Sequence, residues 1–354
     1  MNLQNKIIQG VDGVKNLFFS GKLSYVVENK TWVVNEVALS LLEGFKRAGF
    51  KETQITTSRF GLRNQVVHFG SVNTFLKNND FVRVHPSNKV ILTWFHFVPT
   101  DPRNKYIQEA QKTISLLHTS CSLTKNELIK FGVQEEKIKV IPLGVDLALF
   151  KPALKGEKEA LKKELSIPLG SFVVGSFQKD GVGWNEGLEP KLIKGPDVFV
   201  EAMAKLAKAF PIFVLLVGPA RGYVKRELAK RGIPFFNVGF LKEVRDVAKY
   251  YQALDLYIVS SRIEGGPQSI LESLASNVPL VSTKVGMAED VIRNGENGFL
   301  TEIENVEEIV QKASEVLSNK VLRSRLALEG RKTALEYSWD KIAQRYLNEL
   351  YLNL

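Results

Sequence analysis

Cysteine and histidine are scarce in this sequence, and their scarcity excludes several kinds of site. Cys121 is the only cysteine among 354 residues, so the chain forms no internal disulfide and no cysteine-rich metal site. Such cysteine usage is typical of a reducing cytoplasm. The four histidines are scattered, and none has a partner four residues away, as a helical metal-binding pair would require. We therefore expect no metal centre.

Long hydrophobic runs are also missing. No apolar segment approaches the roughly 18–20 residues that span a bilayer. The N-terminal sequence MNLQNKIIQGVDGVKNLFF lacks the long apolar core of a signal peptide. Both absences predict a cytoplasmic protein, or one that associates peripherally with the inner face of a membrane.

Acidic residues are in deficit, and the deficit is uneven. The net charge is +10. Residues 1–150 hold 19 Lys and Arg against 12 Asp and Glu, and the rest of the chain holds 29 against 26. A basic half indicates an anionic partner, although charge also serves solubility. No dense Lys/Arg run contains interleaved aromatic residues, so we expect no nucleic acid. An anionic membrane surface or a phosphate-bearing acceptor fits better.

Short apolar runs alternate with helical patterns along most of the chain, which predicts an α/β protein with parallel sheets. Residues 33–49 have apolar positions at helical spacing, and Gly49 suits a C-terminal cap. The expected strands are 23–27, 66–70, 90–95, 139–144, 171–177, 210–218, 255–261 and 278–283.

The chain is long enough for two domains, and a charged segment with two prolines, residues 150–171, separates its halves. We predict one domain over 1–150 and a second over 151–339. A C-terminal helix at about 340–354 is expected to pack back onto the first domain. Ligands bind outside the carboxyl ends of parallel strands, so the cleft between the domains is the favoured site.

The segment SSRIEGGPQSILESLASNVPLVS, residues 260–282, follows a predicted strand and has features of a phosphate site. Gly265 and Gly266 have no side chain to keep a ligand from the backbone. Pro267 suits the first turn of a helix, whose free N–H groups would face an anion. The bland alternative is an ordinary turn.

Two carboxylates flank this turn. Glu264 and Glu272 could each accept hydrogen bonds from neighbouring hydroxyl groups, although paired glutamates are also common on solvated faces. A ligand with phosphates between two polyhydroxylated rings is a nucleotide sugar.

The pattern EGGPxxxLE, followed by SLASNVPLVSTKVG and NGENGFL, resembles the signature of glycosyltransferase family 4. Further segments resemble the same family: KVIPLGVDLALFKP (139–152), GSFQKD (175–180), KGPDVFVEA (194–202) and EYSWDKIAQRYLNELY (336–351). Members are retaining enzymes of the GT-B fold. The resemblance therefore implies an α/β protein with two Rossmann-like domains facing each other across a cleft.

The resemblance also implies roles for individual residues. Lys194 matches a lysine of the family's phosphate-binding segment, and His96 matches its cleft histidine near the donor sugar. Glu264 would bind the donor sugar and Glu272 the ribose. The implied catalytic residues are His96, Lys194 and Glu264. The implied nucleotide-sugar contacts are Lys179, Phe240, Leu241, Gly265, Gly266, Pro267, Gln268, Ser269 and Glu272.

Some positions depart from the family pattern. Ser176 stands where the family usually has an arginine, and Lys179 or Lys191 is expected to supply that charge to the leaving diphosphate. The insertion 180–193 is expected to form a loop over the cleft. Asn277 replaces a usual glycine, a mild change because asparagine tolerates left-handed backbone.

The first domain departs further. The loop after its first strand lacks the family's glycines, and Lys30, Thr31 and Trp32 would line the cleft instead. His68 also follows a predicted strand; we favour a core position for it over one facing the acceptor.

These observations predict a metal-independent, retaining hexosyltransferase, with a nucleoside diphosphate sugar as co-substrate and no other cofactor. It would transfer a hexose to a hydroxyl acceptor, a glycan or a lipid-linked glycan. A sugar-nucleotide epimerase of GT-B-like fold and a non-catalytic carbohydrate-binding homologue remain alternatives. A dinucleotide dehydrogenase is disfavoured, because no G-x-G-x-x-G follows the first strand of either domain.

Overall fold

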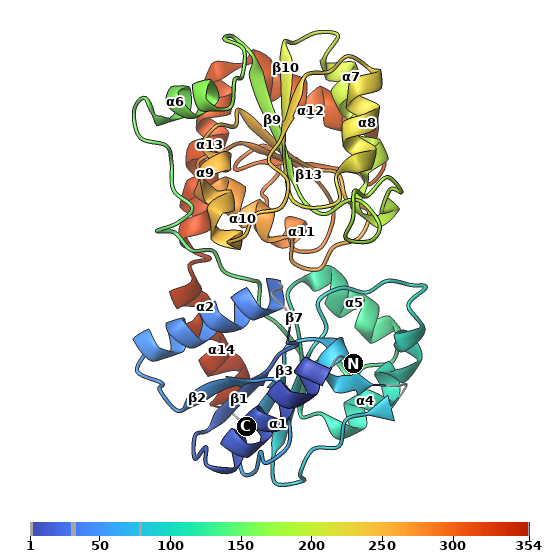
Figure 1. Cartoon of the computed structure of the whole chain (residues 1–354), viewed down its shortest axis with the longest axis vertical. Coiled ribbons are helices and arrows are strands. Elements are labelled where there is room, and N and C mark those ends of the chain that lie inside the picture. The colour runs from blue at the N-terminus through green and yellow to red at the C-terminus, as the bar shows by residue number, and fades with distance from the viewer. Residues whose placement is uncertain (1–2, 30–32, 78–79, 353) are drawn as a thin grey trace. The chain divides into compact units, whose positions relative to one another are not determined.

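The computed structural model of the chain contains two compact units, each built on one six-stranded sheet (Figure 1). It describes residues 3–29, 33–77, 80–352 and 354. Unit 1 comprises residues 1–144 and 339–354, and unit 2 comprises 145–338. The first boundary falls earlier than the predicted position 150, because the Val145 N–H donates to the Tyr337 carbonyl at 2.9 Å. The two segments that enter and leave unit 2 thus pair with each other inside that unit.

The sheet of unit 1 is wholly parallel, with the order β2-β1-β3-β6-β7-β8. Its strands are β1 (Leu23–Val26), β2 (Thr53–Thr56), β3 (Val66–Phe69), β6 (Lys89–Thr93), β7 (Leu116–Thr119) and β8 (Ile138–Val140). A separate antiparallel pair consists of β4 (Leu76–Lys77) and β5 (Asp80–Phe81).

The helices of unit 1 are α1 (Leu3–Leu17), α2 (Val33–Arg47), α3 (Val72–Phe75), α4 (Ile107–Thr113), α5 (Ser122–Lys130) and α14 (Trp339–Tyr346), which a π-helical turn (Leu347–Tyr351) extends. Gly49 follows α2 with φ of +86°, the left-handed conformation of a helix C-terminus. A Cβ on Gly44 of α2 would lie 2.5 Å from the Cβ of Ala343, so α14 packs very closely against α2. The C-terminal segment therefore belongs to unit 1.

The sheet of unit 2 is also parallel, with the order β11-β10-β9-β12-β13-β14. Numbered within the unit, this is the order 3-2-1-4-5-6 of the Rossmann fold. Its strands are β9 (Phe172–Phe177), β10 (Ile212–Val217), β11 (Phe235–Asn237), β12 (Leu256–Val259), β13 (Leu280–Thr283) and β14 (Phe299–Thr301).

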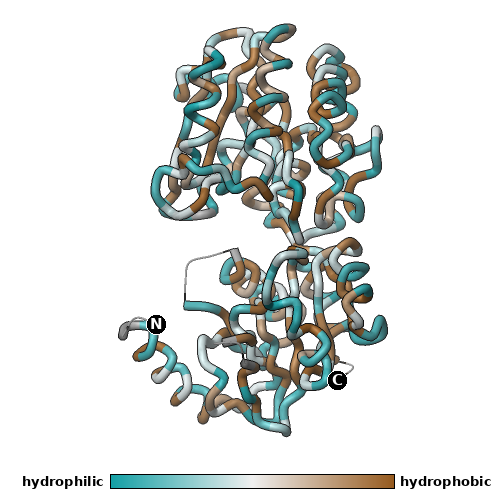
Figure 2. Tube along the Cα trace, turned by 90° about the vertical axis from the view of Figure 1, so that its right-hand side faces the viewer, coloured by the Kyte–Doolittle hydropathy of each residue, from teal (hydrophilic) through white to brown (hydrophobic). Residues whose placement is uncertain are grey.

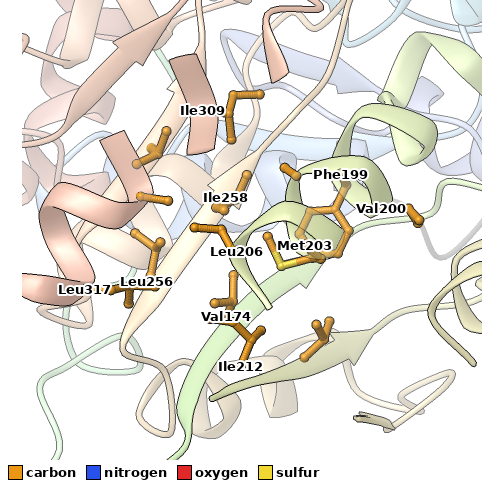
Figure 3. Close-up of a cluster of buried hydrophobic side chains, with 14 of the residues drawn as sticks. Val174, Phe199, Val200, Met203, Leu206, Ile212, Leu256, Ile258, Ile309 and Leu317 are labelled. Atoms are coloured by element: carbon orange, nitrogen blue, oxygen red, sulfur yellow. The ribbon is translucent and has the colours of Figure 1, made fainter. Parts of the chain in front are cut away.

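The helices of unit 2 are α6 (Glu157–Glu164), α7 (Pro196–Leu206), α8 (Gly222–Lys230), α9 (Ala248–Tyr251), α10 (Gln268–Ala275), α11 (Ala288–Val291), α12 (Val306–Ser318) and α13 (Lys320–Leu335). One apolar core joins the strands to α7, α8 and α12. Figure 3 shows Val174 and Ile258 of the sheet packed among Phe199 and Met203 of α7 and Ile309 of α12. Burial of these side chains is the main force holding the helices on the sheet.

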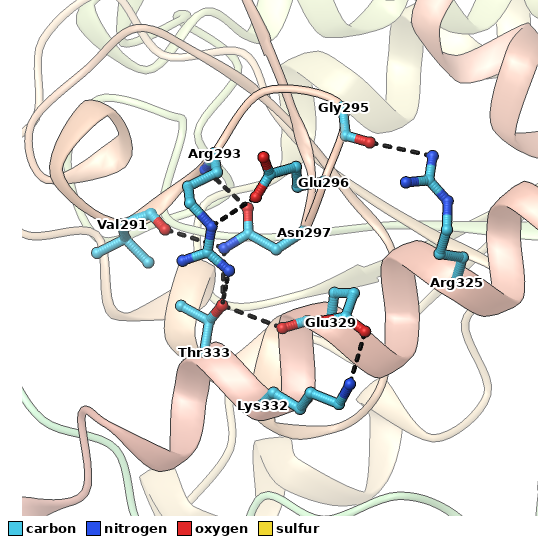
Figure 4. Close-up of polar contacts among 9 residues, drawn as sticks. All are labelled: Val291, Arg293, Gly295, Glu296, Asn297, Arg325, Glu329, Lys332 and Thr333. Carbon is cyan, nitrogen blue, oxygen red and sulfur yellow. Dashed lines mark hydrogen bonds and ion pairs between the residues drawn. The ribbon is translucent and has the colours of Figure 1, made fainter.

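A polar cluster fastens the loop before β14 to α13 (Figure 4). The fully buried Asn297 amide donates to the Val291 carbonyl at 3.1 Å and to the Thr333 hydroxyl at 2.8 Å. The Asn297 side-chain oxygen accepts from the Arg293 N–H at 2.8 Å. Asn297 belongs to the NGENGFL segment, so this part of the signature serves packing.

The fold class predicted from the sequence, α/β with two Rossmann-like domains, is confirmed. Asn277 has φ of +59°, the conformation that made its exchange for glycine a mild one. Within the described residues, every helix is too short or too polar to cross a bilayer.

Candidate functional site

The strand order of unit 2 reverses at β9, which has β10 on one side and β12 on the other. Loops that leave β9 and β12 at their carboxyl ends diverge there, and ligands of open α/β sheets bind at such a point. The segments GSFQKD and SSRIEGGP leave from these two strands. The chain therefore brings together two motifs that lie about 85 residues apart.

Gly195 lets a third segment, KGPD, join these loops. Its φ is +60°, and a Cβ there would lie 1.9 Å from the Ser260 carbonyl oxygen. The Ser260 hydroxyl donates to the Gly195 carbonyl at 2.9 Å. No side chain fits between these backbones, so the position requires glycine.

Lys194 and Glu264 form an ion pair in the space that Gly195 opens. The Lys194 Nζ lies 2.6 and 2.7 Å from the two Glu264 carboxylate oxygens. The Ser261 hydroxyl donates to one of those oxygens at 2.9 Å. The side chains are 22% and 11% exposed, so a ligand can reach both. Two of the three implied catalytic residues thus meet in one place.

Lys179 and Lys191 add positive charge beside Lys194. Burial, followed by the charges of Lys194 and Lys179, lowers the pKa of Lys191. The Lys179 Nζ donates to the Gly181 carbonyl at 3.1 Å and lies 5.0 Å from the centre of the Trp184 ring. Three lysines against one glutamate leave an excess of positive charge, which suits a bound anion.

The insertion after Lys179, residues 180–193, forms a loop whose two ends are hydrogen-bonded to each other. Its ends pair where the Lys191 N–H donates to the Asp180 carbonyl at 2.7 Å. At its far side, a Cβ on Gly187 would lie 2.3 Å from the Ala220 carbonyl oxygen. The loop is therefore packed on the residues that precede α8.

Arg221 holds the base of this loop, and no sequence signal identified it. Its buried guanidinium donates to the Ser176 carbonyl at 2.6 Å and the Gln178 carbonyl at 2.9 Å, and it pairs with Asp180 at 3.0 Å. Burial raises the pKa of Asp180, and the charge of Arg221 opposes that rise. The Arg221 side chain has no exposed surface, so it cannot contact a ligand. It acts by holding the backbone of the segment after β9 in place.

The Gly-Gly-Pro turn packs against a second glycine. A Cβ on Gly286 would lie 2.2 Å from the Gly265 carbonyl oxygen, and Gly286 has φ of +52°. Helix α10 begins one residue later than expected, since Pro267 occupies the N-cap and not the first turn. The remaining predicted contacts of this turn, Gly266, Gln268 and Ser269, are partly exposed.

Glu272 lies in the second turn of α10 and is held by Tyr251. The Tyr251 hydroxyl donates to one Glu272 oxygen at 2.8 Å. Burial raises the pKa of Glu272 to about 7, although the hydrogen bond from Tyr251 lowers it. The carboxyl therefore ionises near neutral pH, which is unusual for a glutamate.

Phe240 and Leu241 follow β11. The Gly218 N–H, at the end of β10, donates to the Gly239 carbonyl at 3.0 Å and fixes the start of this segment. Phe240 is 70% exposed, so its ring is available to a ligand.

His96 belongs to unit 1, where it follows β6 and is exposed. Its charge helps to lower the pKa of Asp101, after the larger effect of the hydrogen bond from Arg103. Arg103 also donates to the Asn73 side-chain oxygen, and the Asn73 amide donates to Glu28 at 3.0 Å. Hydrogen bonds thus connect Asp101, through Arg103 and Asn73, to Glu28 at the carboxyl end of β1.

A cavity of about 320 Å³ lies at this edge of unit 1. The order of the sheet reverses here too, since β1 has β2 and β3 as its neighbours. The polar side chains that line it come from α1, from α3 and from loops that follow the strands: Asn5, Gln9, Glu28, Asn29, Thr57, Ser58, Arg59, Asn73 and Thr74. Amides, hydroxyls and one carboxylate can exchange hydrogen bonds with a polyhydroxylated ligand.

His68 occupies the core, the position favoured for it. It is fully buried, with Nδ1 2.6 Å from the Tyr351 hydroxyl and Nε2 2.7 Å from the Thr93 hydroxyl. The predicted cleft residues Lys30, Thr31 and Trp32 lie outside the described residues. Among the residues that the structure does describe, no group of three His, Cys, Asp or Glu side chains could hold a metal ion.

Comparison with known families identifies the domain that carries most of this site. Residues 188–333 match the family glycosyl transferases group 1. The match includes Lys191, Lys194, Glu264 and Glu272 but begins after Lys179. The narrower assignment to glycosyltransferase family 4 is consistent with this match and stays a prediction.

Curated relatives match over parts of their length. D-inositol 3-phosphate glycosyltransferase of Corynebacterium urealyticum is 29% identical over 235 residues, 63% of this chain and 53% of that protein. The putative glycosyltransferase EpsD of Bacillus subtilis is 27% identical over 256 residues, 69% of this chain and 64% of that protein. The chain thus spans about half to two thirds of these relatives.

A solved structure matches nearly the whole chain. Anabaena HepE, crystallised in complex with UDP-glucose, has a TM-score of 0.74 at 17% identity, covering 94% of this chain and 100% of that one. This likeness shows that the two proteins share the GT-B fold.

Proposed function

We propose that the chain is a retaining, metal-independent hexosyltransferase that uses a nucleoside diphosphate sugar. The supporting observation is the group of three lysines around Glu264 at the point where the sheet of unit 2 reverses. A diphosphate needs positive charge as it leaves, and a hexose needs a hydrogen-bond acceptor for its hydroxyls. UDP-glucose is our first choice of donor, because HepE binds it in a similar fold.

In this proposal the donor separates Lys194 from Glu264. Lys194 turns to the diphosphate together with Lys179 or Lys191, and Glu264 accepts hydrogen bonds from the hexose. The backbone from Gly265 to Ser269 lies along the phosphates. Glu272 binds the ribose, and Phe240 and Leu241 lie beside the base.

The acceptor hydroxyl attacks the anomeric carbon on the face from which the diphosphate departs. The carbon–oxygen bond to the diphosphate breaks as the new glycosidic bond forms, and the hydroxyl proton passes to the leaving phosphate oxygen. Configuration is thereby retained without a covalent enzyme intermediate, and Glu264 orients the sugar. The lysines stabilise the charge that grows on the diphosphate.

The acceptor that we propose is a glycan or a lipid-linked glycan, bound in the polar cavity of unit 1. A lipid-linked acceptor would place the protein in the cytoplasm at an anionic membrane surface.

Ligand-induced stabilisation tests donor binding. UDP-glucose at about 100 times its Kd should stabilise the folded chain by about 2.7 kcal/mol, a rise of several degrees in Tm. Lys194→Met should abolish that rise. Lys205→Met is the matched control, because Lys205 forms an exposed ion pair with Glu307 on the same unit. An equal response in both variants would refute the role of Lys194.

Product analysis separates the mechanisms. Glu264→Gln should lose most transfer activity while still binding UDP, and mass spectrometry should find no sugar on Glu264 in the wild type. A trapped glycosyl adduct there would overturn the proposed mechanism. Conversion of donor alone into an epimer, seen by chromatography, would favour the epimerase instead.

A further inference from the structure

Helix α1 has its polar face turned toward the protein. The Asp12 carboxylate accepts from the Thr57 N–H at 2.9 Å and from the Thr57 hydroxyl at 2.7 Å. The Asn16 amide donates to the Ser58 carbonyl at 2.9 Å and to the Phe60 carbonyl at 2.8 Å. About two turns before Asp12, Asn5 accepts from the Asn29 amide at 2.8 Å. These hydrogen bonds attach the polar face of the helix to unit 1.

The apolar face of α1 is turned away from the protein. Ile7, Val11 and Val14 are 59%, 48% and 56% exposed. At about 100° per residue they fall within a stripe about 60° wide, on the side of the helix opposite to Asp12 and Asn16. Phe18, just beyond the helix, is 84% exposed and continues the stripe. Figure 2 shows α1 running from the N label with hydrophilic and hydrophobic residues in alternation.

This orientation reverses the usual one. A surface helix normally buries its apolar stripe, as α2 of the same unit does with Val37, Leu41 and Phe45, all fully buried. In α1, by contrast, Ile7, Val11 and Val14 leave about half of their surface exposed. An exposed apolar stripe on a well-anchored helix indicates a surface that something else covers.

The charges beside the stripe identify its partner. Lys6 and Lys15 are exposed and lie on opposite sides of it, and Arg59 is exposed next to Phe60, another exposed apolar side chain. Asp12 is the only acidic residue of α1, and it faces inward. A second copy of the chain, placed symmetrically on the stripe, would bring like charges together. An anionic lipid surface suits both the apolar stripe and the lysines beside it. Lipid tails accept the apolar residues, and the headgroups attract the lysines.

We propose that the outer face of α1, defined by Ile7, Val11, Val14 and Phe18 with Lys6 and Lys15 at its borders, docks the protein on an anionic bilayer surface. The helix lies in the plane of the headgroups. This inference rests on the membrane contact proposed above and names its surface; it does not require the transfer reaction.

The docking helix is also a wall of the polar cavity of unit 1. Asn5 and Gln9, on its inner face, line that cavity. A bilayer against the outer face of α1 would therefore lie one helix diameter, about 10 Å, from the cavity. This arrangement suits an acceptor whose polar head remains attached to a lipid.

Vesicle sedimentation with the full chain tests the docking face. The wild type should sediment with vesicles of phosphatidylcholine containing about 30% phosphatidylglycerol, and should stay in solution with phosphatidylcholine alone. The double variant Val11→Asp/Val14→Asp should bind the anionic vesicles at least tenfold more weakly. Lys6→Glu/Lys15→Glu should also lose at least tenfold, since each lysine near such a surface contributes about fivefold.

The control places one aspartate at an exposed apolar position elsewhere. Leu169 of unit 2 is fully exposed, and Leu169→Asp should bind vesicles as the wild type does. All four proteins should keep the same Tm rise with UDP-glucose, so failure of the docking face and failure of donor binding are distinguished.

Three results would overturn the proposal: no preference for anionic vesicles, vesicle binding that survives Val11→Asp/Val14→Asp, or an equal loss in Leu169→Asp. A concentration-dependent dimer in sedimentation velocity that this double variant abolishes, without vesicle binding by the wild type, would assign the stripe to a second copy instead.

Discussion

Each unit has six parallel strands, but among the described residues the buried histidines belong to unit 1 and the buried charged pair to unit 2. Unit 1 buries neutral, titratable side chains in its core: Tyr25, His68, His118, Tyr346 and Tyr351. Unit 2 has an apolar core and buries a charged pair, Arg221 with Asp180, at the carboxyl edge of its sheet. A buried network of neutral groups loses stability when one of its groups is protonated. A buried ion pair loses stability when one partner is removed.

The network of unit 1 has one consistent proton arrangement. The Ile141 carbonyl can only accept, so His118 Nε2, at 2.9 Å, carries a proton and Nδ1 accepts from the Thr93 hydroxyl. Thr93 then accepts from His68 Nε2, and His68 Nδ1 accepts from Tyr351. An extra proton on either ring would force the facing hydroxyl, of Thr93 or Tyr351, to turn its own proton away. The C-terminal segment is thus fixed to the sheet by neutral imidazoles.

The largest effect should come from breaking the pair in unit 2. Arg221→Met leaves the Asp180 carboxylate buried without a cation and removes three carbonyl contacts of the guanidinium. We expect unit 2 to lose about 3–5 kcal/mol of stability, measured by urea unfolding followed with hydrogen exchange in each unit. Arg226→Met, at an exposed arginine of α8, is the control and should cost less than about 0.5 kcal/mol. A loss below about 1 kcal/mol in Arg221→Met would refute the structural role of the pair.

Acid should act mainly on unit 1. Burial lowers the pKa of His118 to about 4 and, together with the charge of His118, lowers that of His68. The unfolded chain binds these protons near pH 6.5, so stability is complete above that pH and is lost as the pH falls toward 4. The shift of the His118 pKa contributes on the order of 3 kcal/mol to the free energy of unfolding at neutral pH.

Fluorescence of Trp94 and Trp339, both buried in unit 1, can follow urea unfolding between pH 7.5 and pH 4. His118→Asn should be less stable than the wild type at pH 7.5 but should lose less on acidification. Parallel pH profiles for the two proteins would contradict this assignment.

A third effect should have the opposite sign, and it belongs to unit 2. The folded Glu272 carboxyl, with a pKa of about 7, binds a proton that the unfolded chain has released above about pH 4.5. Its contribution is therefore complete below pH 4.5 and is lost as the pH rises through 7. Glu272→Gln should make the free energy of unfolding of unit 2 less dependent on pH between pH 5 and pH 8, as measured by hydrogen exchange. If the slope persisted, another group would be responsible.

Strong patterns predicted their elements well, and weak ones were missed. The apolar runs at β1, β3, β6, β9, β10, β12 and β13 were expected to be strands. No strand was expected for β2, β7 or β14, which are only three or four residues long. The sequence of β2, TQIT, has only one apolar residue. Because β2 lies at the edge of the sheet, it need not be buried on both faces, and its sequence gives no strand signal. The LLHT of β7 contains His118, whose burial depends on partners far along the chain.

The chemistry of the site could be predicted from the sequence, but its geometry could not. The motifs around Lys194 and Glu264 indicated a phosphate and a sugar, yet nothing local indicated that the two side chains would pair. Arg221 lacked any signal, since its role depends on Ser176, which lies 45 residues earlier. Helix α1 has a clear amphipathic pattern, but the pattern does not say which face turns inward.

The sequence by itself determined which segments become strands and helices, and which residue types follow the strands of unit 2. Those properties depend on local spacing and on side-chain chemistry. Only the tertiary structure decided that Lys194 meets Glu264, that Arg221 lies beneath Ser176, and that α1 turns its apolar face outward. Each of these depends on contacts between segments distant along the chain, which the order of strands in the folded sheet brings together.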